Sequence, residues 1–253
     1  MEAGDDGAAA LIAAAWLAAI HLFASRLDCL RSPPRSVWLS FAGGAALAYT
    51  FVHLLPELAI GGERTGIYDS LGGSILLAHS FVLGGLIAFY TLEQAVAGEQ
   101  RRRGRDHLDP GTPVFWLHLS SFTAYNALIG YLLVQRSREG AWSFGTFVAA
   151  MSFNLLVNDR GLQARHGAHY PRLSRFLLAG AVLLPGWLLG WLLPARGLGL
   201  ALLFALLAGG AILNLLKEEL PRERRSRAAP FAVGAALYAV ILIFGSLSRG
   251  PGA

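Results

Sequence analysis

Polar side chains interrupt a strongly apolar sequence at spacings that place them on one face of a helix. The groups that stand out are His53 with Glu57, Asn154 with Asn158, and Glu218 with Glu219. Residues four apart share a helical face. Imidazole and carboxylate groups bind divalent cations, whereas amides either line a polar pathway or hydrogen-bond neighbouring membrane helices. Carboxylates at helix ends either receive and release a cation or are simply hydrated, and the spacing alone leaves both interpretations open.

The elements that position these residues are predicted from the apolar runs. Of the 253 residues, 55% are hydrophobic and 15% are charged, whereas soluble domains carry roughly 25% charged residues. The runs are about 18 to 23 residues long, enough to cross the hydrocarbon core of a bilayer as helices. Because lipid satisfies no backbone N–H or C=O and the runs do not alternate, the sequence predicts an all-α integral membrane protein rather than a barrel.

Eight membrane-spanning helices are predicted within a single domain of residues 1–253. The expected spans are 8–27, 37–60, 71–93, 113–134, 144–159, 176–194, 198–216 and 229–247. The fifth span is the most polar, since it holds Ser152, Asn154, Asn158 and Asp159. A helix this polar is expected to face other helices or water rather than lipid.

The basic residues are divided unevenly between the two sides of the predicted membrane. The first, third, fifth and seventh connectors hold most of them: Arg26, Arg31 and Arg35; Arg101, Arg102, Arg103 and Arg105; Arg160, Arg165, Arg172 and Arg175; and Lys217, Arg222, Arg224, Arg225 and Arg227. Cytoplasmic loops carry such an excess. We therefore expect these connectors inside, both termini outside, and anionic lipid headgroups as partners of the cytoplasmic arginine clusters.

The second and seventh spans repeat one pattern of small residues. The second contains Ala42-Gly43-Gly44-Ala45 and ends at Glu57 beside Pro56, and the seventh contains Ala208-Gly209-Gly210-Ala211 and ends at Glu218 and Glu219 before Pro221. The predicted orientation makes the two helices antiparallel. An inverted repeat is the favoured interpretation, although paired glycines are also common in membrane helices by chance.

The segment from Phe41-Ala42-Gly43-Gly44 to His53-Leu54-Leu55-Pro56-Glu57 resembles the second helix of the Zrt/Irt-like (ZIP) divalent metal transporters. The glycines of the seventh span, Glu93 at the end of the third, the eight helices and the outside termini extend the resemblance. It implies an inverted-repeat bundle in a 3+2+3 arrangement, with a metal site on the fourth and fifth helices. The expected function is transport of a divalent cation, zinc or a similar ion.

The central helices depart from the family pattern. The resemblance aligns Ser121 and Tyr125 of the fourth helix, and Asn154 and Asn158 of the fifth, with positions where the family has histidine or an acid. His118 shares a face with Ser121 and Tyr125 and is a candidate displaced ligand, or a histidine that only bonds a neighbouring helix. Neutral oxygen ligands offset little of the free energy that a divalent cation loses when it is dehydrated. A weak zinc site, a different permeant ion, or loss of transport are all compatible with these residues.

Two other function classes compete with transport. A ZIP-like scaffold or regulatory protein that does not transport is the main alternative. An intramembrane hydrolase is disfavoured because neither clustered metal ligands nor a packed serine nucleophile is present near His118 and Ser121. We therefore do not expect an enzyme. The isolated His21 and His79 are expected to be interior histidines with satisfied hydrogen bonds.

Composition restricts cofactors and partners. Cys29 is the only cysteine, which excludes an intrachain disulfide and a thiolate metal cluster. The net charge of +5 indicates orientation and lipid contact rather than nucleic-acid binding. No resident cofactor is expected apart from a weakly bound divalent cation, and the sequence leaves a homodimer open.

Overall fold

The computed structural model describes residues 2–24, 36–58, 75–104, 107–166, 172–193, 198–219 and 228–248. Every element in these ranges is a helix. In chain order they are α1 (Glu2–Phe23), α2 (Val37–Tyr49), η3 (Thr50–Leu54), α5 (Ile75–Arg103), α6 (Pro113–Ser137), α7 (Ala141–His166), α8 (Arg172–Ala181), η5 (Val182–Trp187), α9 (Leu188–Leu192), α10 (Leu198–Glu219) and α11 (Ala228–Leu247). The π-helical segments η3 and η5 continue their neighbouring α-helices without a break.

Six helical stretches of the described chain are long and apolar enough to cross a membrane. They are Val37–Leu58, His79–Arg103, Pro113–Ser137, Ser174–Leu192, Ala201–Glu218 and Ala228–Leu247. The helix α1 contains a shorter apolar stretch, Gly7–Phe23, and the more polar α7 is not among the six. The described chain is thus all-α with the helices of a multi-pass membrane protein, and six of its helical stretches, not the predicted eight, are long and apolar enough to cross a membrane.

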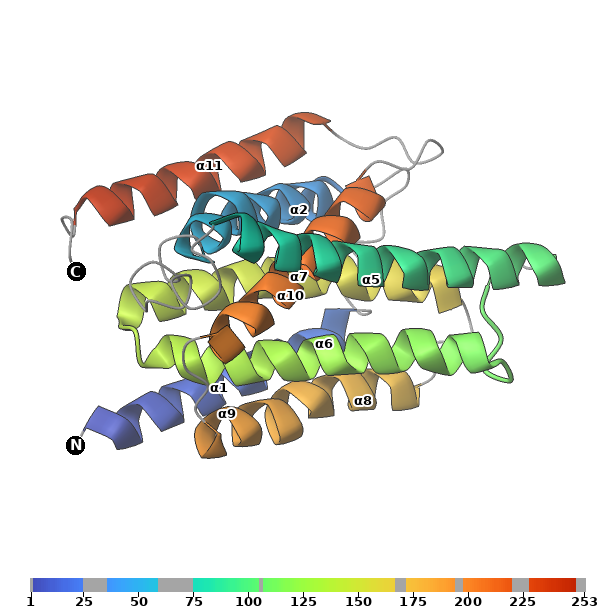
Figure 1. Ribbon diagram of the computed structural model, residues 1–253, viewed down its shortest axis with the longest axis horizontal. Helices are drawn as coiled ribbons and strands as arrows, with labels where there is room; N and C mark the ends of the chain where they lie inside the picture. The colour runs from blue at the N-terminus through green and yellow to red at the C-terminus, as the bar shows by residue number, and fades with distance from the viewer. Residues whose placement is uncertain are drawn as a thin grey trace.

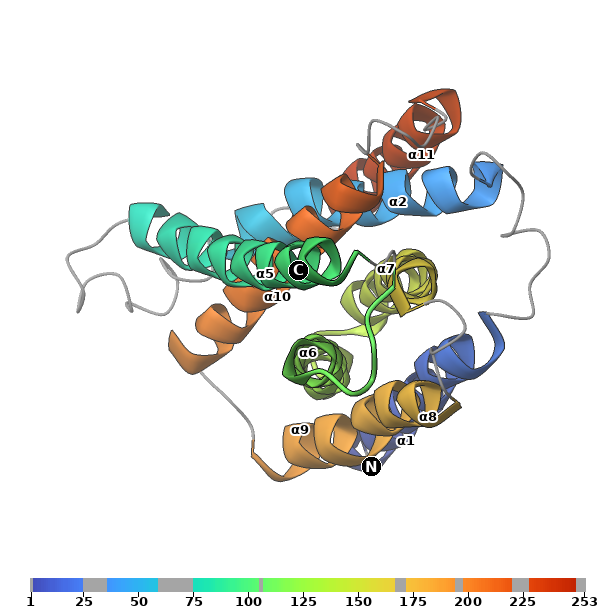
Figure 2. The same ribbon diagram turned by 90° about the vertical axis from the view of Figure 1, so that its right-hand side faces the viewer.

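The helices lie along one long axis and form three groups (Figure 1). Figure 2 shows α6 and α7 between α2, α5, α10 and α11 on one side and α1 with α8 and α9 on the other. The helix α10 packs against both central helices, and α2 packs against α7. The start of α1, the end of α11 and the connection from α6 to α7 all lie at the same end of the bundle.

The α6–α7 hairpin is set by local sequence. The side chain of Thr112 accepts a hydrogen bond from the Phe115 N–H at 3.2 Å, and Pro113 is the first residue of α6. Both features are favoured at helix N-termini. Gly140 has a φ of +104° between the two helices, a conformation that glycine adopts without a steric penalty. The turn is therefore short and fixes the two central helices side by side.

Glycines allow the closest helix crossings. A Cβ atom added at Gly44 of α2 would lie 2.0 Å from the carbonyl oxygen of Phe231 in α11. A Cβ atom added at Gly209 of α10 would lie 2.3 Å from the carbonyl oxygen of Val82 in α5. Small residues permit such backbone approach between membrane helices. The two glycine motifs singled out in the sequence are therefore packing sites.

Several helices are longer than the predicted spans. The third predicted span, 71–93, corresponds to α5, which ends at Arg103, and the fifth, 144–159, corresponds to α7, which spans Ala141–His166. An apolar run indicates only the part of a helix that can lie in the hydrocarbon core of a membrane, and not the polar turns that extend it. The added turns at the end of α5 are polar and are held by Arg103, whose Nε donates to Glu99 Oε1 at 2.5 Å one turn earlier.

Candidate functional site

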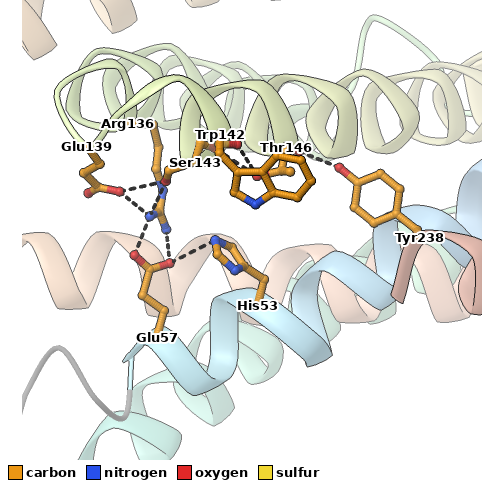
Figure 3. Close-up of polar contacts among 8 residues, drawn as sticks. All are labelled: His53, Glu57, Arg136, Glu139, Trp142, Ser143, Thr146 and Tyr238. Atoms are coloured by element: carbon orange, nitrogen blue, oxygen red, sulfur yellow. Dashed lines mark hydrogen bonds and ion pairs between the residues drawn. The ribbon is translucent and has the colours of Figure 1, made fainter. Parts of the chain in front are cut away.

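A cluster of charged side chains lies where α6 ends and α7 begins (Figure 3). This Arg136 cluster consists of Arg136, Glu57, Glu139, Ser143 and His53. Arg136 is fully buried, and its two terminal nitrogens donate to the two carboxylate oxygens of Glu57, with Nη2 2.5 Å from Oε2. Nη1 also donates to Glu139 Oε2 at 2.5 Å and to Ser143 Oγ at 3.3 Å. This bidentate contact joins the Val37–Leu58 helix to the α6–α7 hairpin.

The surroundings of the Arg136 guanidinium are partly aromatic. Its Cζ lies 4.2 Å from the ring centroid of Phe204 in α10, a cation–π distance. The side chains of Glu57 and Glu139 are 38% and 35% exposed, so water reaches both carboxylates. His53 Nε2 lies 3.6 Å from Glu57 Oε2, on the same helical face one turn earlier. The cluster thus combines two carboxylates, an imidazole and a hydroxyl around one buried guanidinium.

A second charged cluster lies toward the other end of α6. This Lys217 cluster consists of Lys217 in α10, Glu93 in α5 and His118 in α6. Lys217 Nζ donates to Glu93 Oε1 at 2.6 Å, and His118 Nε2 lies 3.2 Å from the same oxygen. His118 is fully buried. Together with Asn158 and Glu218, the side chains of His118 and Lys217 line a gap too narrow for a water molecule.

Neutral polar groups lie between the two clusters. Asn154 Nδ2 donates to the hydroxyl of Tyr125 at 2.8 Å, and both residues are buried. The Asn154 Oδ1 and both polar side-chain atoms of Asn158 and Asn214 are buried without a hydrogen-bond partner among the described residues. Each such group costs about 1–3 kcal/mol. These amides therefore keep unused capacity to bind a polar ligand or water.

One face of α6 connects these groups. Tyr125 follows His118 by seven residues, and Arg136 follows Tyr125 by eleven. Both separations are close to whole numbers of turns at about 3.6 residues per turn, so the three side chains form one stripe. We call this stripe, with its partners from α5, α7, α10 and the Val37–Leu58 helix, the polar column. It has two parts, the Arg136 cluster and the asparagines with the Lys217 cluster, and the buried Ile129, Leu132 and Leu133 of α6 separate them.

Most of the predicted site residues contribute to this column, but Ser121 does not. His53 lies beside Glu57, Tyr125 bonds Asn154, and the narrow gap brings together His118, Asn158 and Glu218. Ser121 is only partly buried, and its hydroxyl donates to the Leu117 carbonyl of its own helix at 2.8 Å. The side chain of Glu219 lies outside the described residues.

The two basic partners, Arg136 and Lys217, are not among the residues predicted for the site. Arg136 was assigned to a connector because it follows the predicted span 113–134, although α6 continues for another turn. Lys217, the only lysine, was counted among the basic residues that determine orientation. One signal in the sequence could have identified both residues. Each lies within one turn of the end of an apolar run, and a carboxylate lies near the end of another run.

A buried triad joins α1 to the central helices. His21 Nδ1 lies 2.8 Å from Asp159 Oδ1, and His21 Nε2 lies 2.9 Å from Asn126 Oδ1. The Asn126 amide nitrogen donates to the Phe122 carbonyl at 2.8 Å, which turns its oxygen toward the imidazole. His21 is thus an interior histidine with hydrogen bonds at both nitrogens, as expected. His79 differs from the expectation, because its side chain is exposed on α5.

The described residues contain no group of three His, Cys, Asp or Glu side chains arranged to hold a metal ion. Among the predicted residues, the nearest approach to such a group is His53 with Glu57, and Arg136 already contacts this carboxylate. No protein-family model matches the sequence, and no curated protein matches it either.

Proposed function

We propose that the chain is a ZIP-like membrane transporter of a divalent metal cation, zinc or a similar ion, that binds weakly in the polar column. The observation that carries this proposal is the set of buried polar groups, from Tyr125 and Asn154 to the Lys217 cluster, inside a bundle of apolar helices. Polar residues inside membrane proteins are costly and typically mark ion or substrate pathways. The amides of Asn154, Asn158 and Asn214, which have no hydrogen-bond partner for one or both polar atoms among the described residues, supply oxygen ligands between Tyr125 and the Lys217 cluster.

The packing supports an inverted repeat in which the three helices before the α6–α7 pair in the sequence correspond to the three helices after it. Gly44 and Gly234 lie at the crossing of α2 with α11, and Gly209 and Gly85 lie at the crossing of α10 with α5. In such a repeat α2 corresponds to α10 and α5 corresponds to α11. The crossing of α2 with α11 then corresponds to the crossing of α10 with α5. This is the relation expected for inverted-topology repeats.

Eight crossings and outside termini are part of the proposal. The polar helix α7 is packed among other helices, so it does not need the hydropathy of a lipid-facing span. The start of α1 and the end of α11 share one end of the bundle, consistent with an even number of crossings. The arginine-rich end of α5 lies at the opposite end, which the positive-inside rule assigns to the cytoplasm. The Arg136 cluster then faces outward.

Weak binding follows from the charges of the column. The three ionic side chains Glu57, Arg136 and Glu139 sum to one negative charge, as do Glu93, Lys217 and Glu218 at the other end. The middle of the column is neutral. A dication that loses its hydration shell there gains little Coulombic attraction in return.

A second candidate is a ZIP-like membrane protein that does not transport. The observation in its favour is that Glu57 and Glu93 are each paired with a basic residue of the same chain. A carboxylate already neutralised in this way attracts a mobile cation less strongly. A hydrolase has less support, since Ser121 Oγ bonds a backbone carbonyl and His118 contacts Glu93 rather than a nucleophile.

Zinc flux into liposomes that contain the purified chain and a zinc-sensitive dye tests the proposal. We expect flux above that of empty liposomes, reduced by Asn158→Leu and unchanged by Ser120→Ala on the exposed side of α6. Folded protein that gives no flux above the empty vesicles would favour the non-transporting scaffold.

Cysteine labelling in a Cys29→Ser background tests the orientation. A membrane-impermeant maleimide should label Arg138→Cys in intact cells and Arg102→Cys only after permeabilisation. Both arginines are exposed and lie at opposite ends of the bundle. Labelling of position 102 in intact cells would reverse the proposed topology.

A further inference from the structure

We infer that a groove on the outer face of α6 binds one acyl chain of a membrane phospholipid. The groove has a volume of about 400 Å³ and is lined by Trp116, Leu119, Ser120, Thr123, Ala124 and Ala127 of α6 and by Leu177 of α8. Sites for small ligands typically have volumes of about 300–1,000 Å³. Both helical stretches that form the groove are long and apolar enough to cross a membrane, so lipid is the medium that this surface meets.

The floor of the groove consists of small residues. Ser120 with Ala124, and Thr123 with Ala127, are pairs four residues apart, and the four side chains lie on one face of α6. Ser120 and Ala124 are exposed. The much larger side chain of Trp116 borders the same groove at one end. Such a row of small side chains leaves a channel along the helix that is wide enough for a hydrocarbon chain.

The polar groups of the lining already have hydrogen-bond partners. Ser120 Oγ and Thr123 Oγ1 donate to backbone carbonyl oxygens of the preceding turn, at 3.0 and 2.8 Å. Trp116 Nε1 donates to the carbonyl oxygen of Pro110, just before α6, at 3.0 Å. A polar ligand would lose its hydration in this groove without gaining these donors as partners. The lining therefore suits an apolar ligand.

The length of the groove matches one leaflet of a bilayer. Trp116 and Ala127 are eleven residues apart, which corresponds to roughly 16 Å along the helix. One leaflet contributes about 15 Å to the hydrocarbon core. Trp116 lies near the start of α6, at the same end of the bundle as the arginine-rich end of α5 (Figure 1). Tryptophan is common at this depth, where hydrocarbon meets the headgroups. A chain that enters beside Trp116 thus ends near the middle of the membrane.

The far end of the groove favours an acyl chain over a helix of a second copy. Tyr131 lies one turn beyond Ala127 on the same face of α6, and its hydroxyl donates to the carbonyl oxygen of Leu193 at 2.7 Å. The row of small residues therefore stops at a large side chain that is held in place. A membrane-spanning helix would have to continue past Tyr131 for another leaflet, whereas an acyl chain ends before it.

Photocrosslinking of the full chain in nanodiscs tests the inference. The probe is a phosphatidylcholine with a diazirine near the end of one acyl chain, and the crosslinked residues are located by peptide mass spectrometry. We expect crosslinks on residues 116–127 of α6. Ala124→Phe should reduce them at least about fivefold, because its ring occupies the groove. Ala236→Phe is the matched control, since Ala236 is an exposed alanine midway along α11, outside the groove, and should leave them unchanged.

Native mass spectrometry in detergent provides a second measurement. The wild type should retain one phospholipid per chain and Ala124→Phe should retain none. If Ala124→Phe does not fold, Ser120→Phe blocks the same groove from an exposed position. Equal crosslinking of α6 in the wild type and the folded variant overturns the inference. A change from dimer to monomer in the variant, with lipid crosslinking retained, also overturns it and assigns the groove to a second copy. Neither measurement depends on the proposed transport, which zinc flux tests separately.

Discussion

At both ends of the polar column a carboxylate contacts a basic side chain, but water reaches different partners at the two ends. In the Arg136 cluster the guanidinium is fully buried, whereas Glu57 and Glu139 are 38% and 35% exposed. In the Lys217 cluster the side chain of Glu93 is 9% exposed and that of Lys217 is 17% exposed. The more deeply buried member of the ion pair is therefore the basic residue at the first end and the carboxylate at the second.

The largest expected effect comes from a substitution that disrupts the packing of the helix that carries Glu57. Gly44→Leu should lower the free energy of unfolding by more than about 4 kcal/mol, because the added side chain collides with the α11 backbone and displaces the helix that carries Glu57. Unfolding in mixed detergent micelles measures the change. Gly84→Leu is the control, since a Cβ atom there meets nothing within 4 Å. Equal stability of the two variants would contradict the close crossing.

The next effect separates the two ends directly. Lys217→Met should destabilise the fold by about 3–5 kcal/mol, because it leaves the buried Glu93 carboxylate without its counter-ion. Arg136→Gln should cost less, since water can solvate Glu57 and Glu139. Adding Glu93→Gln should restore much of the stability lost in Lys217→Met. The comparison fails if Arg136→Gln is the more damaging of the two substitutions in the same unfolding assay.

A third prediction concerns the neutral middle of the column. Combining Ser121→His, Tyr125→Glu, Asn154→His and Asn158→Glu should raise zinc affinity by about a hundredfold, because imidazole and carboxylate replace neutral oxygens. Calorimetry with the folded variant measures this. Because Ser121 is only partly buried and bonds its own helix, the same set without Ser121→His should retain most of the gain. No gain in either variant would refute the alignment of α6 and α7 with the ZIP pattern.

The smallest effect probes one hydrogen bond of the Arg136 cluster. Ser143→Ala should reduce stability by about 0.5–1.5 kcal/mol, since its hydroxyl donates to Glu139 at 3.0 Å and accepts from Arg136. Ser246→Ala, on the exposed face of α11, should change stability less. An effect of Ser143→Ala as large as that of Arg136→Gln would show that the hydroxyl, rather than the charges, organises this end.

The sequence was sufficient for those features that depend on local composition. Apolar runs predict the helices, whereas the partners of Gly44 and Gly209, which are α11 and α5, were not predicted from the paired glycines. The spacing of His53 and Glu57 predicts their contact, since one helix carries both. The limits of the prediction appear at α7, whose polar residues are compatible with a crossing only because other helices surround it.

Contacts between distant segments were not predictable in the same way. Glu57 and Arg136 are 79 residues apart, and neither the length of an apolar run nor a motif specifies that they meet. The sequence flagged both Glu93 and His118, but their shared contact with Lys217 depends on how three helices pack. Ser121 was placed on the pathway by alignment, whereas its short side chain satisfies itself on the preceding turn, as serine often does in membrane helices.

The short α6–α7 hairpin has a consequence for how the protein enters the membrane. Glu139 and Ser143 lie only three and seven residues beyond Arg136, and both bond its guanidinium. These contacts close as soon as the hairpin forms, before distant helices are in place, because contacts between near neighbours in sequence form first. Arg136 can therefore enter the bilayer already neutralised by its own turn. Glu57 completes the pair later, when the inserted helices assemble.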